Sequence, residues 1–125
     1  MKSYDKNNIF AKIIRKEIPA NIVFEDENLL AFHDISKASP IHVLVIPKGE
    51  YVDFVDFSTN AKKEEVAYFF KKISEIAEEL KVINSGFRII SNIGLDAHQT
   101  VPHFHMHILA GKKLGPLLST DQLLR

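Results

Sequence analysis

The residues best suited to chemistry lie in the run His103-Phe104-His105-Met106-His107, towards the C-terminal end of the chain. Successive side chains of an extended strand point to opposite faces, so the three histidines are expected to share one face. Phe104 and Met106 would then point to the other, apolar face. Imidazole titrates near neutral pH, so a neutral ring can attack an electrophile while a protonated ring donates to a leaving group. The run therefore predicts a site for nucleophilic and acid–base chemistry.

The same spacing bears on metal binding. Neighbouring Cβ atoms on one strand face lie about 7 Å apart, whereas a metal ion holds nitrogen ligands at ~2 Å. One ion therefore cannot bind all three histidines of the run without bending the strand. Zinc held by His42 and two of these histidines stays open as an alternative. So does a purely structural role, in which the histidines hydrogen-bond to neighbours on a half-exposed strand.

Length, charge and composition narrow the class of protein. The 125 residues fit one domain, 1–125, and Lys+Arg equals Asp+Glu at 16 each, so no basic field favours nucleic acid or an anionic membrane. The chain has no cysteine, which excludes disulfides and cysteine-ligated metal sites. It begins with a polar stretch and has no apolar run near the ~18 residues of a membrane span. We therefore expect a cytoplasmic protein.

Five segments of the chain have the pattern of strands. Two of them, 22–25 and 29–34, flank a short polar turn and predict an antiparallel hairpin. The segment 41–47 is apolar on both faces apart from His42, which is typical of a central strand. A further strand is expected at 87–92, and the polar loop 93–100 then leads into the histidine strand.

Two segments have the pattern of helices. Apolar residues at 9, 10, 13 and 14 predict a short helix with Asn7 or Asn8 as N-cap, ended by Pro19. Residues 61–81 predict an amphipathic helix of about five turns, whose apolar stripe must cover a sheet. The resulting order indicates an α+β domain: a mainly antiparallel five-stranded sheet, one long helix packed on a face, and a short N-terminal helix. The histidines would line the other face.

The histidine run and three further blocks resemble the histidine-triad (HIT) family, in its Hint branch of nucleotide hydrolases. The family pattern, His-x-His-x-His followed by two apolar residues, is met by 103–109. The other blocks stand in the family's order at 9–14, at 32–35 with 40–48, and at Asn92-x-Gly94 with 99–101. The resemblance spans roughly residues 8–115, and it leaves short extensions at 1–7 and about 112–125.

The resemblance implies a reaction and a catalytic set. His105 matches the nucleophile that attacks the α-phosphorus of a nucleoside 5′-phosphoramidate, such as adenosine 5′-phosphoramidate, or of a related ester. Attack gives a nucleotidyl-histidine intermediate, which water converts to an AMP-like product. His107 matches the residue near the leaving group, where it would act as acid. His103 and His42 complete the histidine cluster. No metal or cofactor is implied.

The resemblance also implies how a purine nucleotide substrate would be bound. Asp34 aligns with the carboxylate that binds the ribose hydroxyls. The remaining nucleotide-binding positions comprise three walls of the base pocket and three residues that contact or orient the phosphate and leaving group, namely Phe10, Phe32 and Ile35, and Asn92, Gln99 and Thr100. The Hint branch further forms homodimers through the long helix and an adjoining strand, so a homodimer is expected.

The chain departs from the family pattern at several positions. His98 stands where a glycine usually precedes the glutamine, which would alter the loop's approach to phosphate or bring an extra imidazole to the leaving group. Asn8 and Ala11 replace zinc-binding cysteines of some bacterial relatives, and the chain has no tryptophan in its tail. Two other functions stay open: a nucleotide-binding or interaction module with little turnover, and a dinucleoside polyphosphate hydrolase of another HIT branch.

Overall fold

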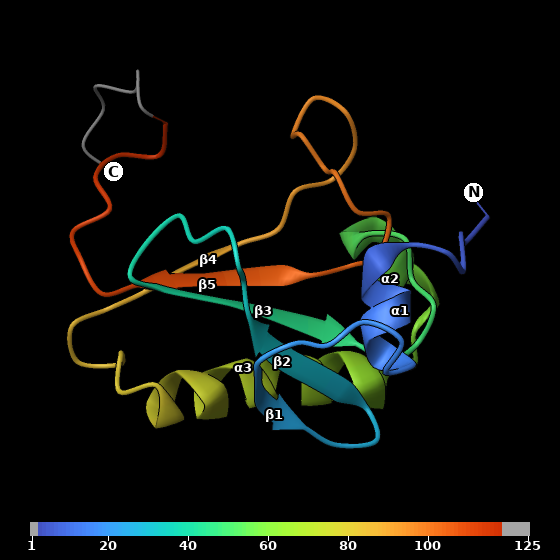
Figure 1. Cartoon of the computed structure of the whole chain (residues 1–125), viewed down its shortest axis with the longest axis horizontal. Coiled ribbons are helices and arrows are strands. Elements are labelled where there is room, and N and C mark those ends of the chain that lie inside the picture. Colours follow the sequence, from blue (N-terminus) through green and yellow to red (C-terminus); the bar gives the residue numbers. More distant parts are fainter. Residues whose placement is uncertain (1–2, 119–125) are drawn as a thin grey trace.

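A computed structural model describes residues 3–118, which form one five-stranded antiparallel sheet in the order β1-β2-β3-β5-β4. The strands are β1 (Ile22–Glu25), β2 (Leu29–His33), β3 (Ile41–Pro47), β4 (Arg88–Ile90) and β5 (Met106–Ala110). The helices are α1 (Ile9–Ile14), α2 (Phe54–Asn60) and α3 (Lys63–Glu79). α3 runs across one face of the sheet, and α1 stands beside the start of β5 (Figure 1). The predicted α+β class, five-stranded sheet, long helix and short N-terminal helix are confirmed. Residues 1–2 and 119–125 of the expected extensions lie outside the described residues.

The hairpin of β1 and β2 and the central position of β3 follow from local sequence. The Asp26 carboxylate accepts the N–H groups of Asn28 and Leu29 at 2.8 and 3.0 Å, which closes the turn. β3 lies between β2 and β5 and is apolar on both faces because both faces are covered. Val43 and Val45 pack on the α3 side, whereas Leu44 and Ile46 pack with α1 on the other side.

Phe104 fixes the segment that carries the histidines to the core on the α3 side. Its ring centroid lies 4.8 Å from that of Phe57 and 5.2 Å from that of Phe69, and all three rings are buried. Burying one such ring stabilises the fold by about 1.5–3 kcal/mol. Phe104, Met106 and Ile108 all pack on this side. The two histidines between them, His105 and His107, therefore face the other side. The predicted alternation is therefore confirmed.

α1 begins as expected and ends earlier than expected. The Asn8 side chain caps the helix by accepting the N–H of Ala11 at 2.8 Å. The helix ends at Ile14 because Lys16 adopts a left-handed conformation with φ 66°, so Pro19 is not its terminator. None of the helices within residues 3–118 is both long and apolar enough to cross a membrane.

α2 was not predicted from the sequence. Asp53 caps this helix by accepting the N–H of Asp56 at 2.8 Å, and Asp56 in turn accepts the N–H of Val52 at 2.8 Å. This arrangement resembles a capping box, except that Asp56 accepts the N–H of the residue before the N-cap in place of the N–H of the N-cap residue itself. The spacing of the two aspartates just before Phe57, which is buried, was the available signal.

β5 begins at Met106, so the expected strand does not include the first two histidines. The β3–β5 register pairs Val45 with Met106, and continuing it would place Pro47 opposite Phe104. Proline has no N–H to donate to a ladder, so regular pairing stops there. The N–H of Phe104 donates instead to the carbonyl of Tyr51, at 2.7 Å.

Candidate active site

A cavity of about 350 Å³ opens on the sheet face opposite α3. Its apolar end is formed by α1 and the segment that follows it, and its polar end by β5 and the loop after β2. Seven of the predicted site residues line it, namely Phe10, Phe32, Asp34, Ile35, Thr100, His105 and His107. The other four, His42, His103, Asn92 and Gln99, stand outside this lining. The predicted nucleophile and the predicted acid are thus brought together at one cavity.

The hydrogen bonds of His105 define which of its nitrogens can react. Its Nδ1 lies 2.6 Å from the carbonyl oxygen of His103, so Nδ1 carries the proton and donates it. Nε2 is then left with a free lone pair. The ring is held edge-on by Phe10 at a centroid distance of 4.9 Å, and Ser91 donates its hydroxyl to the His105 carbonyl at 2.9 Å. The imidazole is therefore oriented as a nucleophile through Nε2.

His107 has the opposite tautomer, because of a hydrogen-bonded chain that begins in the backbone. The N–H of Ala38 donates to Nδ1 of His42 at 3.0 Å, so the proton of neutral His42 is on Nε2. That nitrogen lies 2.8 Å from Nδ1 of His107 and donates to it. Neutral His107 consequently carries its proton on Nε2. The cavity thus presents a bare nitrogen on His105 beside an N–H on His107, with ring centroids 5.2 Å apart.

His103 is fully buried and both of its ring nitrogens have partners. Nε2 donates to the carbonyl of Pro47 at 2.8 Å, which gives this carbonyl a donor where the pairing of β3 with β5 has stopped. Nδ1 accepts from the hydroxyl of Tyr4 at 2.6 Å. The sequence analysis missed Tyr4, which stands in the polar N-terminal segment. His103 therefore acts by holding the chain that carries His105, without reaching the cavity itself.

Replacing Tyr4 by phenylalanine is expected to lower the free energy of unfolding by about 1–2 kcal/mol, because Nδ1 of buried His103 would lose its donor. Chemical denaturation of the variant measures the loss. Tyr68→Phe is the matched control, since the Tyr68 hydroxyl donates to Asp26 at the surface, where little loss of stability is expected. Equal losses in the two variants would show that the hydrogen bond to His103 stabilises the fold no more than a hydrogen bond at the surface does.

Burial lowers the pKa of all four histidines of the cluster. The pKa falls to about 4 for His103 and to about 4 for His107, whose charged form is further opposed by His105 and His42. Asp34 acts in the opposite direction on His105 and His107, and a bound phosphate would do the same. In the free protein at neutral pH these rings are therefore uncharged, which is the nucleophilic form of His105.

The low pKa of His103 predicts acid sensitivity of the fold. An unfolded histidine titrates near pH ~6.5, whereas folded His103 titrates near pH 4, so the unfolded state binds more protons between these values. The stability due to neutral His103 is complete above pH ~6.5 and is lost as the pH falls towards 4, by on the order of 2–3 kcal/mol. Chemical unfolding measured from pH 7 to 5 tests this. The slope of the unfolding free energy against pH should be smaller in His103→Gln, because the glutamine side chain does not titrate.

Asp34 lies beside His42 and His107, and the distances between the possible ligand atoms of these three side chains resemble those of a metal site. The possible ligand atoms of Asp34, His42 and His107 lie within 4.8 Å of one another, and this set differs from the alternative of His42 with two residues of the run. A histidine ligand normally donates a hydrogen bond through its other nitrogen. Here Nδ1 of His42 accepts one from Ala38, so its Nε2 has no lone pair for an ion. The donor set therefore does not fit a metal ion.

The comparisons with known proteins agree with this geometry. A family model described as the HIT domain matches residues 15–114 of this chain. The chain belongs to the HIT family.

Relatives and solved structures cover almost the whole of this HIT protein. An uncharacterised HIT-like protein of Azospirillum brasilense is 51% identical over 94% of this chain and 97% of its own length. The purine nucleoside phosphoramidase of Escherichia coli K12 is 38% identical over 91% and 95%, respectively. Among solved structures, a histidine triad protein from Clostridium difficile has a TM-score of 0.83 at 40% identity, covering 91% of this chain and 98% of that one. A HIT family hydrolase from Clostridium thermocellum has a TM-score of 0.82 at 38% identity, covering 90% and 96%.

In this HIT protein the amide of Gln99 is engaged in holding its own loop. Nε2 donates to the carbonyls of Val52 and Val101 at 2.8 and 3.0 Å, and Oε1 accepts the N–H of Gly94 at 3.0 Å. Half-buried Asn92 follows β4 at the start of the same loop. Gln99 is therefore placed to shape the loop that ends at the cavity.

His98 stands where the family pattern has a glycine, and its backbone has a conformation that glycine adopts readily. Its φ is 61°, in the left-handed region that favours glycine, which accounts for the glycine usual at this position. The side chain is exposed and stands outside the cavity lining. In the free protein it therefore adds no further imidazole to the cavity.

Several cavity residues of the HIT protein were not predicted from the sequence. Five of them lie on α1 or just after it, namely Ile9, Ile13, Ile18, Pro19 and Ala20. The other four are neighbours of predicted site residues in the sequence or in the sheet, namely His33, Ser36, Leu44 and Val101. The available signal was the cluster of apolar residues at 18–20, which follows α1 and could pack only near it.

Proposed function

We propose that this HIT protein is a nucleotide hydrolase that cleaves nucleoside 5′-phosphoramidates, such as adenosine 5′-phosphoramidate, through a nucleotidyl-histidine intermediate. The observation that carries the proposal is the pair of opposite tautomers at one cavity: bare Nε2 on His105 and Nε2–H on His107. A phosphoramidate needs both, because its nitrogen is a poor leaving group until it is protonated. The 38% identity to a purine nucleoside phosphoramidase supports the same reaction.

The proposed first step forms a bond between Nε2 of His105 and phosphorus. As the P–N bond breaks, its electron pair stays on nitrogen, which takes a proton from Nε2–H of His107 and leaves as an amine. The negative charge of the bound phosphoryl group raises the pKa of His107, so the His42–His107 pair takes up one proton from solvent when the substrate binds, and His107 gives this proton to the amine. Water then attacks phosphorus and gives a proton back to His107, while the bond between phosphorus and Nε2 of His105 breaks with its electron pair on nitrogen, which releases the nucleoside monophosphate.

The nucleoside would occupy the rest of the cavity. Asp34 accepts the N–H of Ser36 through Oδ1 at 2.8 Å, which leaves the carboxylate with further acceptor capacity for ribose hydroxyls. Phe10, Phe32 and Ile35 would enclose the base, and Ile35 is 99% exposed, so it is free to cover a ligand. Thr100 would contact the phosphate, with Asn92 and Gln99 shaping its loop.

A hydrolysis screen tests this function. Nucleoside 5′-phosphoramidates, dinucleoside polyphosphates and nucleotide sugars are incubated with the protein in the presence and absence of a chelator. We expect the phosphoramidates to be cleaved most efficiently, and equally well with chelator. Preference for a dinucleoside polyphosphate would assign the chain to another HIT activity. Loss of turnover with chelator would favour metal chemistry, and tight AMP binding without turnover would favour a binding module.

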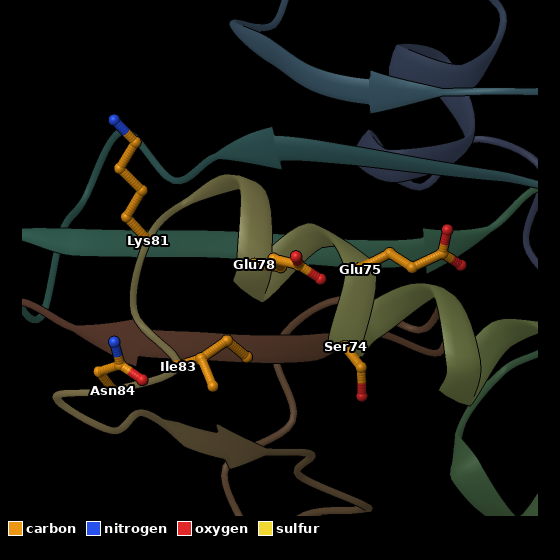
Figure 2. A pocket seen from close by; sticks show the side chains of 6 residues that line it. All are labelled: Ser74, Glu75, Glu78, Lys81, Ile83 and Asn84. Carbon is orange, nitrogen blue, oxygen red and sulfur yellow. The ribbon is translucent and has the colours of Figure 1, made fainter.

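We further propose that the protein forms a homodimer through β4 and the adjoining part of α3. β4 is at the edge of the sheet, and Ile89 on it pairs with buried Ile108, so Ile89 continues the apolar α3 side beyond the covered core. Ile89 is 45% exposed and Ile83 is 49% exposed. Ile83 also lines a hollow of about 600 Å³ formed by the C-terminal part of α3 and the turn after it (Figure 2).

Replacing Ile89 by aspartate is expected to convert a wild-type dimer into a monomer, because a charge would be buried in the joined edge. Light scattering coupled to size exclusion gives the mass of each species. Val55→Asp is the matched control, since Val55 is 56% exposed on α2, away from this edge, and should leave the mass unchanged. A wild-type protein that is monomeric at tens of micromolar would contradict the proposal.

A further inference from the structure

The N-terminal segment 3–8 contacts the histidine cluster, although it precedes the residues 15–114 that the family model matches. The Tyr4 hydroxyl donates to Nδ1 of His103 at 2.6 Å, and the two rings meet edge to face with their centroids 5.6 Å apart. His103 is fully buried, and Tyr4 is half-buried above it. A residue outside the family match therefore completes the surroundings of a residue of the histidine run.

The segment leads into α1, which stands beside the start of β5 (Figure 1), and it is fixed to both ends of this helix. At the start of α1, Nδ2 of the capping residue Asn8 donates to the carbonyl of Asp5 at 2.8 Å. Just after its end, Nη1 of Arg15 donates to the carbonyl of Lys6 at 2.8 Å. Because Tyr4 directly precedes Asp5, these two hydrogen bonds restrict where its ring can lie.

α1 in turn contacts the histidines through Phe10. The centroid of this ring lies 4.9 Å from that of His105 and 6.4 Å from that of His103, and both contacts are edge to face. The N-terminal segment and α1 therefore form one unit that contacts two of the three histidines of the run.

The hydrogen bonds of His103 require a donor at the position of the Tyr4 hydroxyl. The carbonyl of Pro47 can only accept, so the single proton of the neutral ring stays on Nε2, 2.8 Å from that oxygen. Nδ1 then carries a lone pair, and its partner within the described part of the chain is Tyr4. Without the hydroxyl this buried acceptor is left unpaired, which favours a turn of the ring towards another donor or the entry of water.

His103, which Tyr4 holds, also holds the proposed nucleophile. Its backbone carbonyl accepts Nδ1–H of His105 at 2.6 Å, and such a hydrogen bond decides which nitrogen of a neutral histidine is protonated. The ring and the carbonyl of His103 share one Cα, so a turn of the ring shifts the carbonyl. A weakened bond at Nδ1 lets the proton of His105 move to Nε2, and Nε2 then has no lone pair for phosphorus.

A second hydrogen bond holds the same peptide group at its other end. The N–H of Phe104 donates to the carbonyl of Tyr51 at 2.7 Å. A single hydrogen bond still allows a peptide group to tilt, so the side chain of His103 also sets the direction of its carbonyl. The hydroxyl of Tyr4 therefore acts on the one atom that orients His105.

We propose that Tyr4 is a positioning residue of the reaction, which acts through His103 to keep the proton of His105 on Nδ1 and Nε2 free. The inference rests on the proposed function, since a free Nε2 serves the reaction only if it attacks phosphorus. It adds a residue of the N-terminal segment to the active site, although Tyr4 itself stands outside the cavity lining.

The kinetic test is the single-turnover rate of P–N cleavage in Tyr4→Phe, measured as ammonia released from adenosine 5′-phosphoramidate by excess, saturating protein. At saturation this rate constant does not depend on the fraction of molecules that are folded. We expect it to fall about tenfold, because misplacing a reacting group slows the reaction, while the dissociation constant of AMP stays within about twofold. Cleavage by Tyr4→Phe at the wild-type rate would overturn the inference, and so would a loss of AMP affinity as large as the loss in rate.

Ile76→Val is the matched control for lost stability. Ile76 is buried in the core on the α3 side, away from the cavity, so removing one methylene lowers the stability of the fold at a distance from the histidines. We expect this variant to keep the wild-type single-turnover rate. An equal fall in the two variants would show that lower stability accounts for the effect, and it would overturn the positioning role.

Nitrogen-15 NMR tests the tautomer without any substrate. Long-range correlations between the ring protons and ring nitrogens show which nitrogen of each histidine carries the proton. We expect Nδ1–H alone for His105 in the wild type and in Ile76→Val, and a mixture with Nε2–H in Tyr4→Phe. An unchanged His105 tautomer in Tyr4→Phe would overturn the inference.

The two measurements separate failure of the inference from failure of the proposed function. If the wild type cleaves no nucleoside phosphoramidate while the tautomer of His105 still changes in Tyr4→Phe, the proposed reaction fails and the positioning of His105 by Tyr4 stands. A changed tautomer with an unchanged rate of cleavage would overturn the role of Tyr4 in the reaction and leave the reaction itself in place.

Discussion

Replacing His105 by asparagine is expected to abolish phosphoramidate turnover, with a loss in kcat of about 10⁴-fold or more. The asparagine side chain can place an N–H where Nδ1 of His105 now donates to the His103 carbonyl, so the local hydrogen bond is retained. It has no lone pair that can bond to phosphorus. The loss therefore isolates the nucleophile from the folding of the segment that carries it.

Two further measurements make the His105 result decisive. Rapid quenching of the wild type followed by mass spectrometry should detect one covalently bound nucleoside monophosphate, and the variant should show none. His98→Asn is the matched control, because this imidazole is exposed outside the cavity and asparagine tolerates its left-handed backbone; activity should stay within about twofold. Turnover by His105→Asn at the wild-type rate would remove the covalent mechanism.

Replacing His107 by glutamine is expected to reduce turnover of adenosine 5′-phosphoramidate by about 10²–10⁴-fold, the usual contribution of a positioned acid. The amide keeps a similar volume beside His42 and can hydrogen-bond to it, yet it cannot release a proton to a departing amine. An ester with a leaving group that needs no proton, such as p-nitrophenol, should lose less than about tenfold. The ratio of the two losses measures the role of His107 as acid.

The two substrates must respond differently for the assignment to stand. Equal losses on the amidate and on the ester would indicate that His107 positions the phosphate and does not protonate the leaving group. His42→Gln provides a comparison, because His42 stands outside the cavity lining and contacts His107 at 2.8 Å, so this variant should show a smaller loss on the amidate.

The fold could be predicted because its elements depend on patterns that are local in sequence, and seven of the predicted site residues line the cavity. Alternation in the histidine run separates a core face from a polar face. In α3 the helical spacing of the apolar residues indicates an apolar stripe. The local pattern of residues such as Asp34 and Thr100 is also that of an ordinary turn or loop, and the resemblance then gave them specific roles. Both lie at the cavity.

The missed features depend on contacts that are distant in sequence. Tyr4 reaches His103 across 99 positions, and no pattern in the N-terminal segment indicates such a contact. The start of β5 at Met106 depends on which residue of β3 would face Phe104, and that residue is a proline only in this register. The tautomers of His105 and His107 likewise depend on a backbone carbonyl and a backbone N–H that approach them in the folded chain.

The hydrogen-bonded chain from Ala38 through His42 to His107 begins at a peptide group, and a peptide group does not release its proton. A proton given up by His107 cannot be replaced through this chain from the protein interior. In the proposed mechanism it must come instead from the cavity side, through the water that attacks phosphorus. The departing amine would therefore have to leave before that water can enter, and a slowly dissociating amine would hold the protein in its covalent form.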